Sequence, residues 1–319
     1  MSTHATLATK TIVMTGATRG LGRLAAINLL HDNPDLHLVV VARSNGTAVA
    51  EELREASGNP HVTTVTGDLA SLDSLHAAGA TIREQLDRSK LPRLAGFVGN
   101  AGLQLLRATD DTVDGFEMTF AVNVLANYVL VEELREHFAS SARIVITTSD
   151  THFGDFKHNM GMVPGPVWRD PSDLARPGSA KKADGVVAGR TAYSTSKLAV
   201  VYLVHGLARR LPAGVEIFSF NPGLVPGTGL QRDAGAITRF AFTRIMPVIT
   251  LTPYARRMNV SGADLAAAAI GPAPGPSGSY INGKALEPSS PASYDPDRED
   301  ALWNELRRIA GRPNAALAS

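Results

Sequence analysis

The sequence of 319 residues contains no cysteine, almost no net charge and no long apolar run. The absence of cysteine excludes disulfide bonds, thiolate metal sites and thiol catalysis, and leaves the compartment undetermined. A formal net charge of +1 gives no reason to expect nucleic acid or an anionic membrane as the main partner. The most apolar stretch, 198–207, is interrupted by His205 and falls short of the ~20 residues that span a bilayer. No transmembrane segment is therefore predicted.

Targeting and metal-binding patterns are also missing. The first ten residues, MSTHATLATK, lack the charged and apolar regions of a secretory signal, so a cytoplasmic protein is expected. Nine histidines are present, but His152 and His158 lie in an expected loop without carboxylate or thiolate partners at ligand spacing. No metal site is predicted.

Short runs of branched apolar residues alternate with segments of helical periodicity. The runs that predict strands are 11–15, 36–42, 61–66, 94–99, 143–148 and 215–220, with a weaker one at 278–281. The segments that predict helices are 21–30, 48–56, 71–86, 116–138, 191–211 and 299–310. This alternation is typical of an α/β protein. We predict a single Rossmann-type domain over 1–319, with a doubly wound parallel sheet of about seven strands and helices on both faces.

Two segments interrupt this alternation, at about 150–190 and 223–261. Both exceed the typical connection of ~2–6 residues. Both follow expected strands at the carboxyl edge of the sheet, where substrate loops usually lie. For residues 170–185, a disordered surface excursion is an equal alternative. Apolar residues of the first insertion, Trp168 among them, would line an apolar substrate pocket or simply pack on the sheet.

A glycine-rich turn, TGATRGLG at 15–22, directly follows the first expected strand and opens the first expected helix. Glycine permits the tight turn and lets backbone N–H groups approach a pyrophosphate at the positive end of the helix. Because glycine also occurs in tight turns that bind nothing, the position after the strand carries the weight. The expected cofactor contacts in this turn are Gly16, Thr18, Arg19, Gly20, Leu21 and Gly22.

The residue after the second expected strand predicts the choice of cofactor. An NAD-preferring protein usually places an acid there to hold the ribose 2′-hydroxyl, whereas this chain has Arg43 followed by Ser44. With Arg19, Arg43 would clamp a 2′-phosphate, so NADP(H) is predicted; as an alternative, either arginine is a solvated surface charge. After the third expected strand, Asp68 and Leu69 would meet the adenine, although Asp68 could equally cap the next helix.

Tyr193 and Lys197 stand four residues apart at the start of an expected helix, so both side chains project from one face. A phenol has an ordinary pKa of ~10. A nearby ammonium favours the phenolate, which would let Tyr193 exchange a proton with a carbonyl or alcohol near neutral pH. A YxxxK pair alone is common and mostly structural, so its weight comes from the residues that accompany it.

Further polar segments follow the expected strands or lie in the helix between them. They are Asn100-Ala101-Gly102, Asn123, Ser149 and Asn221-Pro222-Gly223. Together with the TGxxxGxG turn and the YxxxK pair, this pattern resembles the short-chain dehydrogenase/reductase family over about residues 10–230. The resemblance implies cofactor contacts at Asn100, Ala101 and Gly102 in addition to the glycine-rich turn.

The resemblance also implies a role for each residue at the reacting centre. Tyr193 would donate the proton, and Lys197 would lower the pKa of Tyr193 and bind the nicotinamide ribose. Ser149 would hydrogen-bond the substrate oxygen, and Asn123 would hold a water in a proton relay. As alternatives, Asn123 bonds to the helix backbone, and Ser149 caps a turn while Thr148 takes the hydroxyl role.

The segment after the sixth expected strand would meet the carboxamide edge of the nicotinamide. The implied contacts are Pro222, Gly223, Val225 and Thr228, the last lying one residue farther from the Pro-Gly pair than is usual. Residues 222–230, PGLVPGTGL, are similar to the light-dependent protochlorophyllide reductases, and the long gap between Ser149 and Tyr193 is shared with retinol-dehydrogenase-like members. Because protochlorophyllide reductases rely on cysteine in their pigment site, that activity is not predicted.

These residues predict reversible hydride transfer between NADP(H) and a carbonyl or secondary alcohol, running as carbonyl reduction on an apolar or ring-containing small molecule. One alternative is reduction of a conjugated C=C bond. Another is an NADP-binding sensor or scaffold, although such a protein has no chemical need for the full catalytic set. A homo-oligomer is open: family members often pair through helices equivalent to 116–138 and 191–211, and long insertions can obstruct that pairing.

Overall fold

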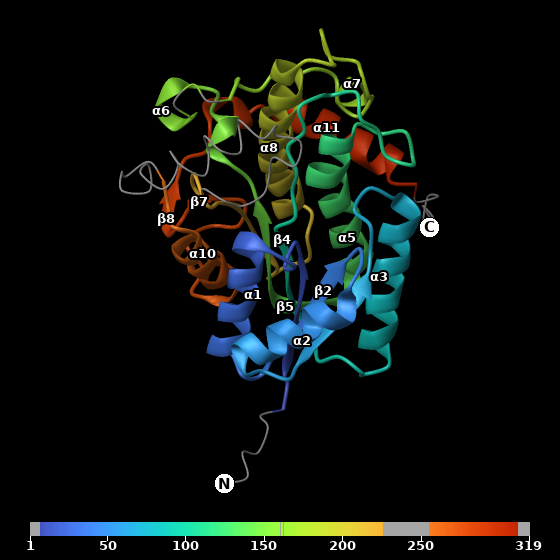
Figure 1. Ribbon diagram of the computed structural model, residues 1–319, viewed down its shortest axis with the longest axis vertical. Helices are drawn as coiled ribbons and strands as arrows, with labels where there is room; N and C mark the ends of the chain where they lie inside the picture. The colour runs from blue at the N-terminus through green and yellow to red at the C-terminus, as the bar shows by residue number, and fades with distance from the viewer. Residues whose placement is uncertain (1–6, 160, 162, 226–254, 312–319) are drawn as a thin grey trace.

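The protein forms one eight-stranded sheet in the order β3-β2-β1-β4-β5-β6-β7-β8 (Figure 1). The computed structural model describes residues 7–159, 161, 163–225 and 255–311. The strands are β1 (Lys10–Thr15), β2 (Leu36–Ala42), β3 (Val62–Thr66), β4 (Leu94–Gly99), β5 (Phe138–Thr147), β6 (Glu216–Asn221), β7 (Tyr280–Asn282) and β8 (Ala285–Glu287). All neighbours are parallel except β7 and β8. The expected runs match β1 to β7, and β8 adds a short antiparallel edge.

The sheet is doubly wound, as the alternation of elements predicts. β2 and β3 extend it to one side of β1, whereas β4 to β7 extend it to the other side. The connections therefore leave β1 and β4 in opposite directions, and a crevice opens at the carboxyl ends of these two strands. Ligands of open α/β sheets bind at this switch point.

Helices cover both faces of the sheet. They are α1 (Gly20–Asp32), α2 (Gly46–Ser57), α3 (Leu72–Asp87), α4 (Met118–Phe120), α5 (Ala126–Leu134), α6 (Phe156–Asn159), α7 (Pro171–Leu174), α8 (Val186–Ala208), α10 (Met258–Ile270) and α11 (Pro296–Ile309). A π-helical turn, Ala121–Leu125, joins α4 to α5. The sequence does not predict α10, because its alanine-rich stretch has no clear division into an apolar and a polar face. In the structure α10 packs against α1.

The apolar side chains form one layer on each face of the sheet. On β1, Ile12 and Met14 belong to the layer beneath α1, α2 and α10, whereas Val13 belongs to the layer beneath α3, α5 and α8. Successive strand residues point to opposite faces, so a strand that is covered on both sides buries a continuous apolar run. Figure 1 shows α1 and α10 on one side of the sheet and α3 and α5 on the other.

The helix α11 covers a face of α8 beside α5. Its buried residues Leu302, Trp303, Leu306 and Ile309 share one cluster with the apolar residues of α5 and α8. The ring of Trp303 meets the ring of Tyr128 of α5 edge-on, with 5.3 Å between centroids. The helix α11 therefore packs against both α5 and α8.

The segment 170–185 of the first long insertion is packed rather than extended from the surface. Ala108, which follows β4, donates its N–H to the carbonyl of Ala183 at 2.7 Å and accepts from the N–H of Gly178 at 2.8 Å. Trp168, just before this segment, lies edge-on against a tyrosine of α8 at 4.8 Å between ring centroids. Backbone pairing of this kind ties the insertion to the carboxyl edge of the sheet.

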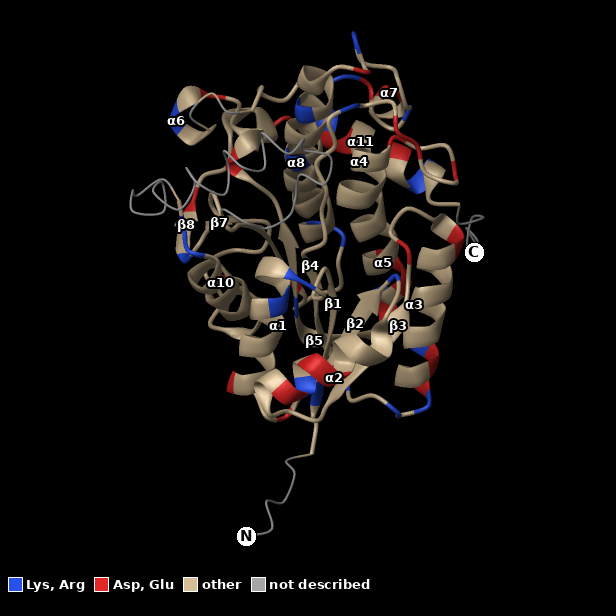
Figure 2. Ribbon diagram, viewed as in Figure 1, with Lys and Arg blue, Asp and Glu red and all other residues tan. Residues whose placement is uncertain are grey.

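Charged residues of both signs are interspersed over the helices and loops in view in Figure 2. Many of them form pairs, such as Lys10 with Asp35 at 3.1 Å. Exposed pairs contribute only about 0–1 kcal/mol each, so the stability of the fold comes mainly from the two apolar layers. Among the described helices, none is both long enough and apolar enough to cross a membrane.

Candidate active site

The glycine-rich turn lies at the carboxyl end of β1, where the sheet order reverses. Gly16 has φ +72°, a left-handed conformation that favours glycine. A Cβ placed on Gly22 would lie 2.1 Å from the carbonyl oxygen of Gly16 and 2.3 Å from Nδ2 of Asn100. Both positions exclude a side chain, which lets the first turn of α1 pack closely beneath this loop.

The helix α1 begins after this turn without a side-chain cap. Its N-cap residue is Arg19, whose side chain makes no capping hydrogen bond, and its first turn has no acidic residue. The first N–H groups of a helix have no intrahelical partner and attract an anion. Thr18 is exposed beside them, whereas Leu21 is buried, so only the backbone of Leu21 is placed to meet a ligand. The start of α1 suits a pyrophosphate.

Two arginines stand at neighbouring strand ends. Arg19 follows β1, Arg43 and then Ser44 follow β2, and all three are exposed. Within the described part of the chain, neither arginine takes part in an ion pair. At the end of β3, Asp68 accepts from the N–H of Ala70 at 3.1 Å and does not cap α3, because the cap is the side chain of Ser71. Asp68 thus shapes the turn beside the predicted adenine position.

The segment after β4 closes against the glycine-rich turn. Nδ2 of Asn100 donates to the carbonyl oxygen of Gly16 at 3.2 Å. The N–H of Ala101 donates to Oγ1 of Thr15 at 3.2 Å. The structure thereby brings together two predicted cofactor segments that are far apart in the sequence.

Asn123 lies in the π-helical turn and is only 1% exposed. Its amide accepts from the N–H of Leu103 at 2.9 Å and donates to the carbonyl of the same residue at 3.0 Å. The amide also donates to Oγ of Ser196 in α8 at 2.9 Å. π-helical turns are frequent at functional sites. Asn123 therefore holds the loop after β4 against α8, and its amide is not bonded to its own helix.

Tyr193 and Lys197 meet Ser149 at the carboxyl end of β5. Tyr193 is 6% exposed and Lys197 is 3% exposed. Nζ of Lys197 lies 5.5 Å from the centre of the Tyr193 ring and donates to the carbonyl of Thr147 at 3.0 Å. The Ser149 side chain lies beside the phenol of Tyr193 and acts to lower its pKa. The structure thus brings the three predicted residues together.

Thr148 was the competing hydroxyl, and its position differs from that of Ser149. Its Oγ1 is buried and donates to the carbonyl oxygen of Lys197 at 2.8 Å. The Thr148 hydroxyl therefore ties β5 to α8, while the Ser149 hydroxyl is the one beside Tyr193.

Burial governs the protonation of the pair in α8. It raises the pKa of Tyr193 to about 12, and the hydrogen bond with Ser149 opposes this only in part. It also lowers the pKa of Lys197 to about 8. The pKa of Tyr193 thus lies above its ordinary value rather than below it as expected, because desolvation of the phenolate is the dominant cause. A phenol that keeps its proton at neutral pH is suited to donate it.

The predicted nicotinamide contacts begin where β6 ends. Gly223 has φ +76°, and its N–H donates to Oδ1 of Asn221 at 3.0 Å. Pro222 is half-buried and Val225 is buried. Thr228 lies outside the described residues.

A half-buried carboxylate that the sequence does not single out holds this end of β6. Asp150 accepts from Nδ2 of Asn221 and, at 2.8 Å, from the phenol of Tyr280 in β7. Burial and the neighbouring Asp150 carboxylate raise the pKa of Tyr280, so its phenol stays a donor. Asp150 and Tyr280 are 130 residues apart. Because they come together only through the order of the strands, no local motif could have found them.

The residues present fit a nicotinamide dinucleotide. The close approach at Gly16 and Gly22, the uncapped start of α1 and the two exposed arginines lie along the carboxyl ends of β1 and β2. These groups suit phosphates. The reacting residues stand after β5, on the other side of the switch point. A dinucleotide in this crevice would have its phosphates over the turn and its nicotinamide toward Tyr193.

Known proteins resemble this chain in sequence and in fold. A family model described as short chain dehydrogenase matches residues 10–160. Retinol dehydrogenase 13 from Homo sapiens is 30% identical over 312 residues, covering 96% of this chain and 86% of that protein. Protochlorophyllide reductase B, chloroplastic, from Hordeum vulgare is 33% identical over 261 residues, covering 77% of this chain and 64% of that protein. A solved blue fluorescent protein from a metagenomic library, in complex with NADPH, shares the fold with a TM-score of 0.60 at 21% identity, covering 86% of this chain and 96% of that one.

Proposed function

Because the chain belongs to the short-chain dehydrogenase family of oxidoreductases, we propose that it reduces the carbonyl group of a small molecule with NADPH. The observation that carries this proposal is the meeting of Ser149, Tyr193 and Lys197 at the carboxyl end of β5, with Nζ of Lys197 5.5 Å from the centre of the Tyr193 ring. Two hydroxyls that face one point can both bind a carbonyl oxygen, and one of them can give it a proton.

The preference for NADPH rests on the exposed arginines. Arg43 stands where an acid would hold the 2′-hydroxyl of NAD, and Arg19 lies at the neighbouring strand end. Guanidinium groups bind phosphate through paired donors, and neither arginine has a competing ion pair among the described residues. A 2′-phosphate would therefore lie between Arg19 and Arg43, with Ser44 beside it.

The residues of this chain would divide the reduction among them. When bound, NADPH supplies the hydride. Ser149 holds the substrate oxygen, and Tyr193 donates its proton to that oxygen as negative charge develops. Lys197, held by the carbonyl of Thr147, stabilises the phenolate that remains and binds the nicotinamide ribose. Asn123 holds the neighbouring loop against α8 and would also hold the water that returns a proton to the site.

The substrate class is inferred from the relatives. Retinol and protochlorophyllide, in the names of the two relatives, are ring-containing compounds with large apolar parts. We infer an apolar or ring-containing carbonyl compound for this chain. The likeness to a protochlorophyllide reductase favours reduction of a conjugated C=C bond as the second candidate. Product analysis with a ring-containing enone separates an allylic alcohol from a saturated ketone.

The proposal is tested by titrating the purified protein with NADPH and NADH, and by following NADPH consumption with ring-containing aldehydes and ketones. NADPH is expected to bind at least about 10-fold more tightly than NADH, with a preference that Arg43→Asp abolishes. Arg88→Asp is the matched control, because Arg88 is an exposed arginine at the far end of α3, paired with Glu84. Absence of binding to both nucleotides would favour the scaffold alternative.

A further inference from the structure

His152 is a buried histidine with both ring nitrogens engaged, and its exposed fraction is 0%. Nδ1 lies 2.6 Å from the carbonyl oxygen of Ser149, and Nε2 lies 3.1 Å from the backbone nitrogen of Ser290. A carbonyl can only accept and a backbone N–H can only donate, so Nδ1 carries the proton and Nε2 accepts. The neutral ring therefore bridges two segments of the main chain, one at Ser149 and the other at Ser290, which lies 138 residues after His152.

The first of these two main-chain segments carries Ser149, the serine of the reacting centre. The Ser149 backbone is extended, with φ −163° and ψ 151°, and a 3-10 turn follows it. The carbonyl of Ser149 accepts a second hydrogen bond, at 3.1 Å, from the backbone N–H of His152. Two donors on one carbonyl fix the peptide plane after Ser149, and with it the direction in which the Ser149 side chain leaves the backbone.

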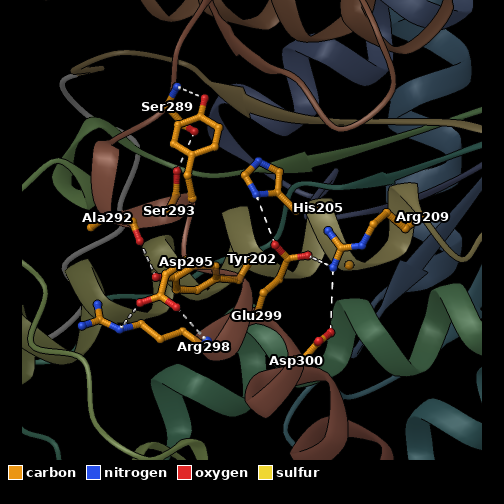
Figure 3. A network of polar contacts seen from close by, with 12 residues as sticks. Tyr202, His205, Arg209, Ser289, Ala292, Ser293, Asp295, Arg298, Glu299 and Asp300 are labelled. Carbon is orange, nitrogen blue, oxygen red and sulfur yellow. Dashed lines mark hydrogen bonds and ion pairs between the residues drawn. The ribbon is translucent and has the colours of Figure 1, made fainter.

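The second main-chain segment, the turn around Ser290, is anchored on α8, as Figure 3 shows. The N–H of Ser293 donates to the carbonyl of Ser290 at 2.9 Å, which closes a turn. The hydroxyl of Tyr202 in α8 donates to the carbonyl of Ala292 in the same turn. Ser290 is itself 1% exposed. The partner of His152 is thus held to the helix that carries the catalytic tyrosine.

These contacts form a closed path from Ser149 through His152 and Ser290 to α8 and Tyr193. We propose that His152 is a positioning residue, which sets the Ser149 hydroxyl against the Tyr193 phenol by holding the Ser149 carbonyl to a turn on α8. The inference rests on the proposed function, in which both hydroxyls bind the carbonyl oxygen of the substrate. Burial lowers the pKa of His152 to about 4, so the ring stays neutral throughout the working pH range.

Two substitutions separate the ring's hydrogen bonds from its volume. His152→Phe keeps the ring and loses both bonds, whereas His152→Asn places an amide N–H where Nδ1–H stands and keeps the bond to Ser149. We expect His152→Phe to lower kcat about 30-fold with NADPH affinity changed less than about 2-fold. His152→Asn should recover only part of that loss, because it keeps the bond to Ser149 and loses the bond to Ser290. His37→Phe is the matched control, because His37 lies at the amino end of β2 and contacts Thr63. Equal losses in both His152 variants would overturn the proposal.

A double-mutant cycle with Ser149→Ala tests whether His152 acts through the serine hydroxyl. Without that hydroxyl nothing remains to be positioned, so His152→Phe should lower the residual single-turnover rate of Ser149→Ala by no more than about 2-fold. A merely structural role would reproduce the full loss in this background, and that result would overturn the proposal.

A readout that needs no turnover distinguishes failure of this inference from failure of the proposed function. In protein with ¹³C-labelled tyrosine rings, His152→Phe should shift the Cζ signal of Tyr193, because the Ser149 side chain lies beside the phenol and acts on its pKa. His152→Asn should shift the signal less than His152→Phe does, because it keeps the bond to Ser149. If the wild-type protein binds NADPH but reduces no carbonyl, that result contradicts the proposed function only. An unchanged Tyr193 signal in His152→Phe contradicts the positioning role of His152.

Discussion

Around the glycine-rich turn, the groups suited to binding have few protein partners, whereas around Ser149 they are saturated. The helix α1 starts without a side-chain cap, and Arg19 and Arg43 are exposed. On the other side of the switch point, Tyr193 is buried, and the ring of His152 has a partner on each nitrogen. The carboxyl edge of the sheet thus carries two regions. In the open region, around the glycine-rich turn, the binding groups have few protein partners. In the closed region, around Ser149, the polar groups already have their partners.

The difference follows from what each region must do. A dinucleotide brings its own acceptors, so a binding region can leave its donors free for the phosphates to complete. A reacting centre must hold a proton donor within a fraction of an ångström before the substrate arrives, so its own hydrogen bonds must already be made. Substitutions in the open region should therefore change binding, and substitutions in the closed region should change turnover.

The sharpest test of this division is Tyr193→Phe. Loss of the proton donor should lower the rate of hydride transfer about 10³-fold, while the dissociation constant for NADPH changes less than about 2-fold. Single-turnover kinetics and calorimetric titration measure the two quantities. If cofactor affinity fell in parallel with the rate, the two regions would not be separate.

Lys197→Met should lower turnover about 100-fold and also change how stability depends on pH. Burial places the folded pKa of Lys197 at about 8, below its ordinary value of 10.5. Between these values the unfolded chain binds more protons, so wild-type stability rises with pH by up to about 1.4 kcal/mol per pH unit. The variant should lack this rise. Urea unfolding of both proteins at pH 8 and pH 10 gives the difference, and parallel curves would contradict a buried ammonium.

Gly22→Ala probes the open region alone. The added methyl group would meet the carbonyl of Gly16 and the amide of Asn100, so the turn must shift. We expect NADPH to bind about 30-fold more weakly, while the ring signal of Tyr193 keeps its wild-type position. Gly185→Ala serves as control, since a Cβ there comes no closer than 3.3 Å to the carbonyl of Lys182. Unchanged NADPH affinity in Gly22→Ala would contradict a cofactor site at this turn.

The smallest expected effect is on the free energy of unfolding at acid pH. The folded pKa of His152 is about 4, below its ordinary value of 6.5, because the ring is buried. Between these values the unfolded chain binds the extra proton, so the free energy of unfolding falls as pH falls, by up to about 1.4 kcal/mol per pH unit. Comparing wild type with His152→Asn at pH 6 and pH 5 isolates this contribution. A gap that stayed constant would mean that the ring titrates equally in both states.

Strands that are covered on both faces could be predicted closely from the sequence. β2 and β4 begin and end at the expected residues, because their branched apolar runs stop abruptly. β5 begins earlier than expected, at Phe138, since two exposed serines interrupt its apolar run. β8 and α10 escaped prediction: β8 is three exposed residues, and α10 is nearly apolar all round.

The candidate site divides in the same way. Ser149, Tyr193 and Lys197 stand in motifs whose order along the chain is informative, and the structure brings them together. His152 attracts attention in the sequence only as an unsupported metal ligand. Its contact with Ser290 depends on where the turn after β8 packs, which neither periodicity nor spacing encodes.

The turn that holds Ser290 follows Ser149, Tyr193 and Lys197 along the chain, and this order has a consequence for synthesis. Translation adds residues from the N-terminus at ~5–20 per second, and folding begins before it ends. The glycine-rich turn and α8 therefore leave the ribosome well before the turn at 289–293 exists. On the proposed role of His152, a nascent chain that stops short of residue 290 holds every catalytic side chain yet lacks their final alignment. On that role, alignment of the reacting centre has to wait until the turn at 289–293 has been made.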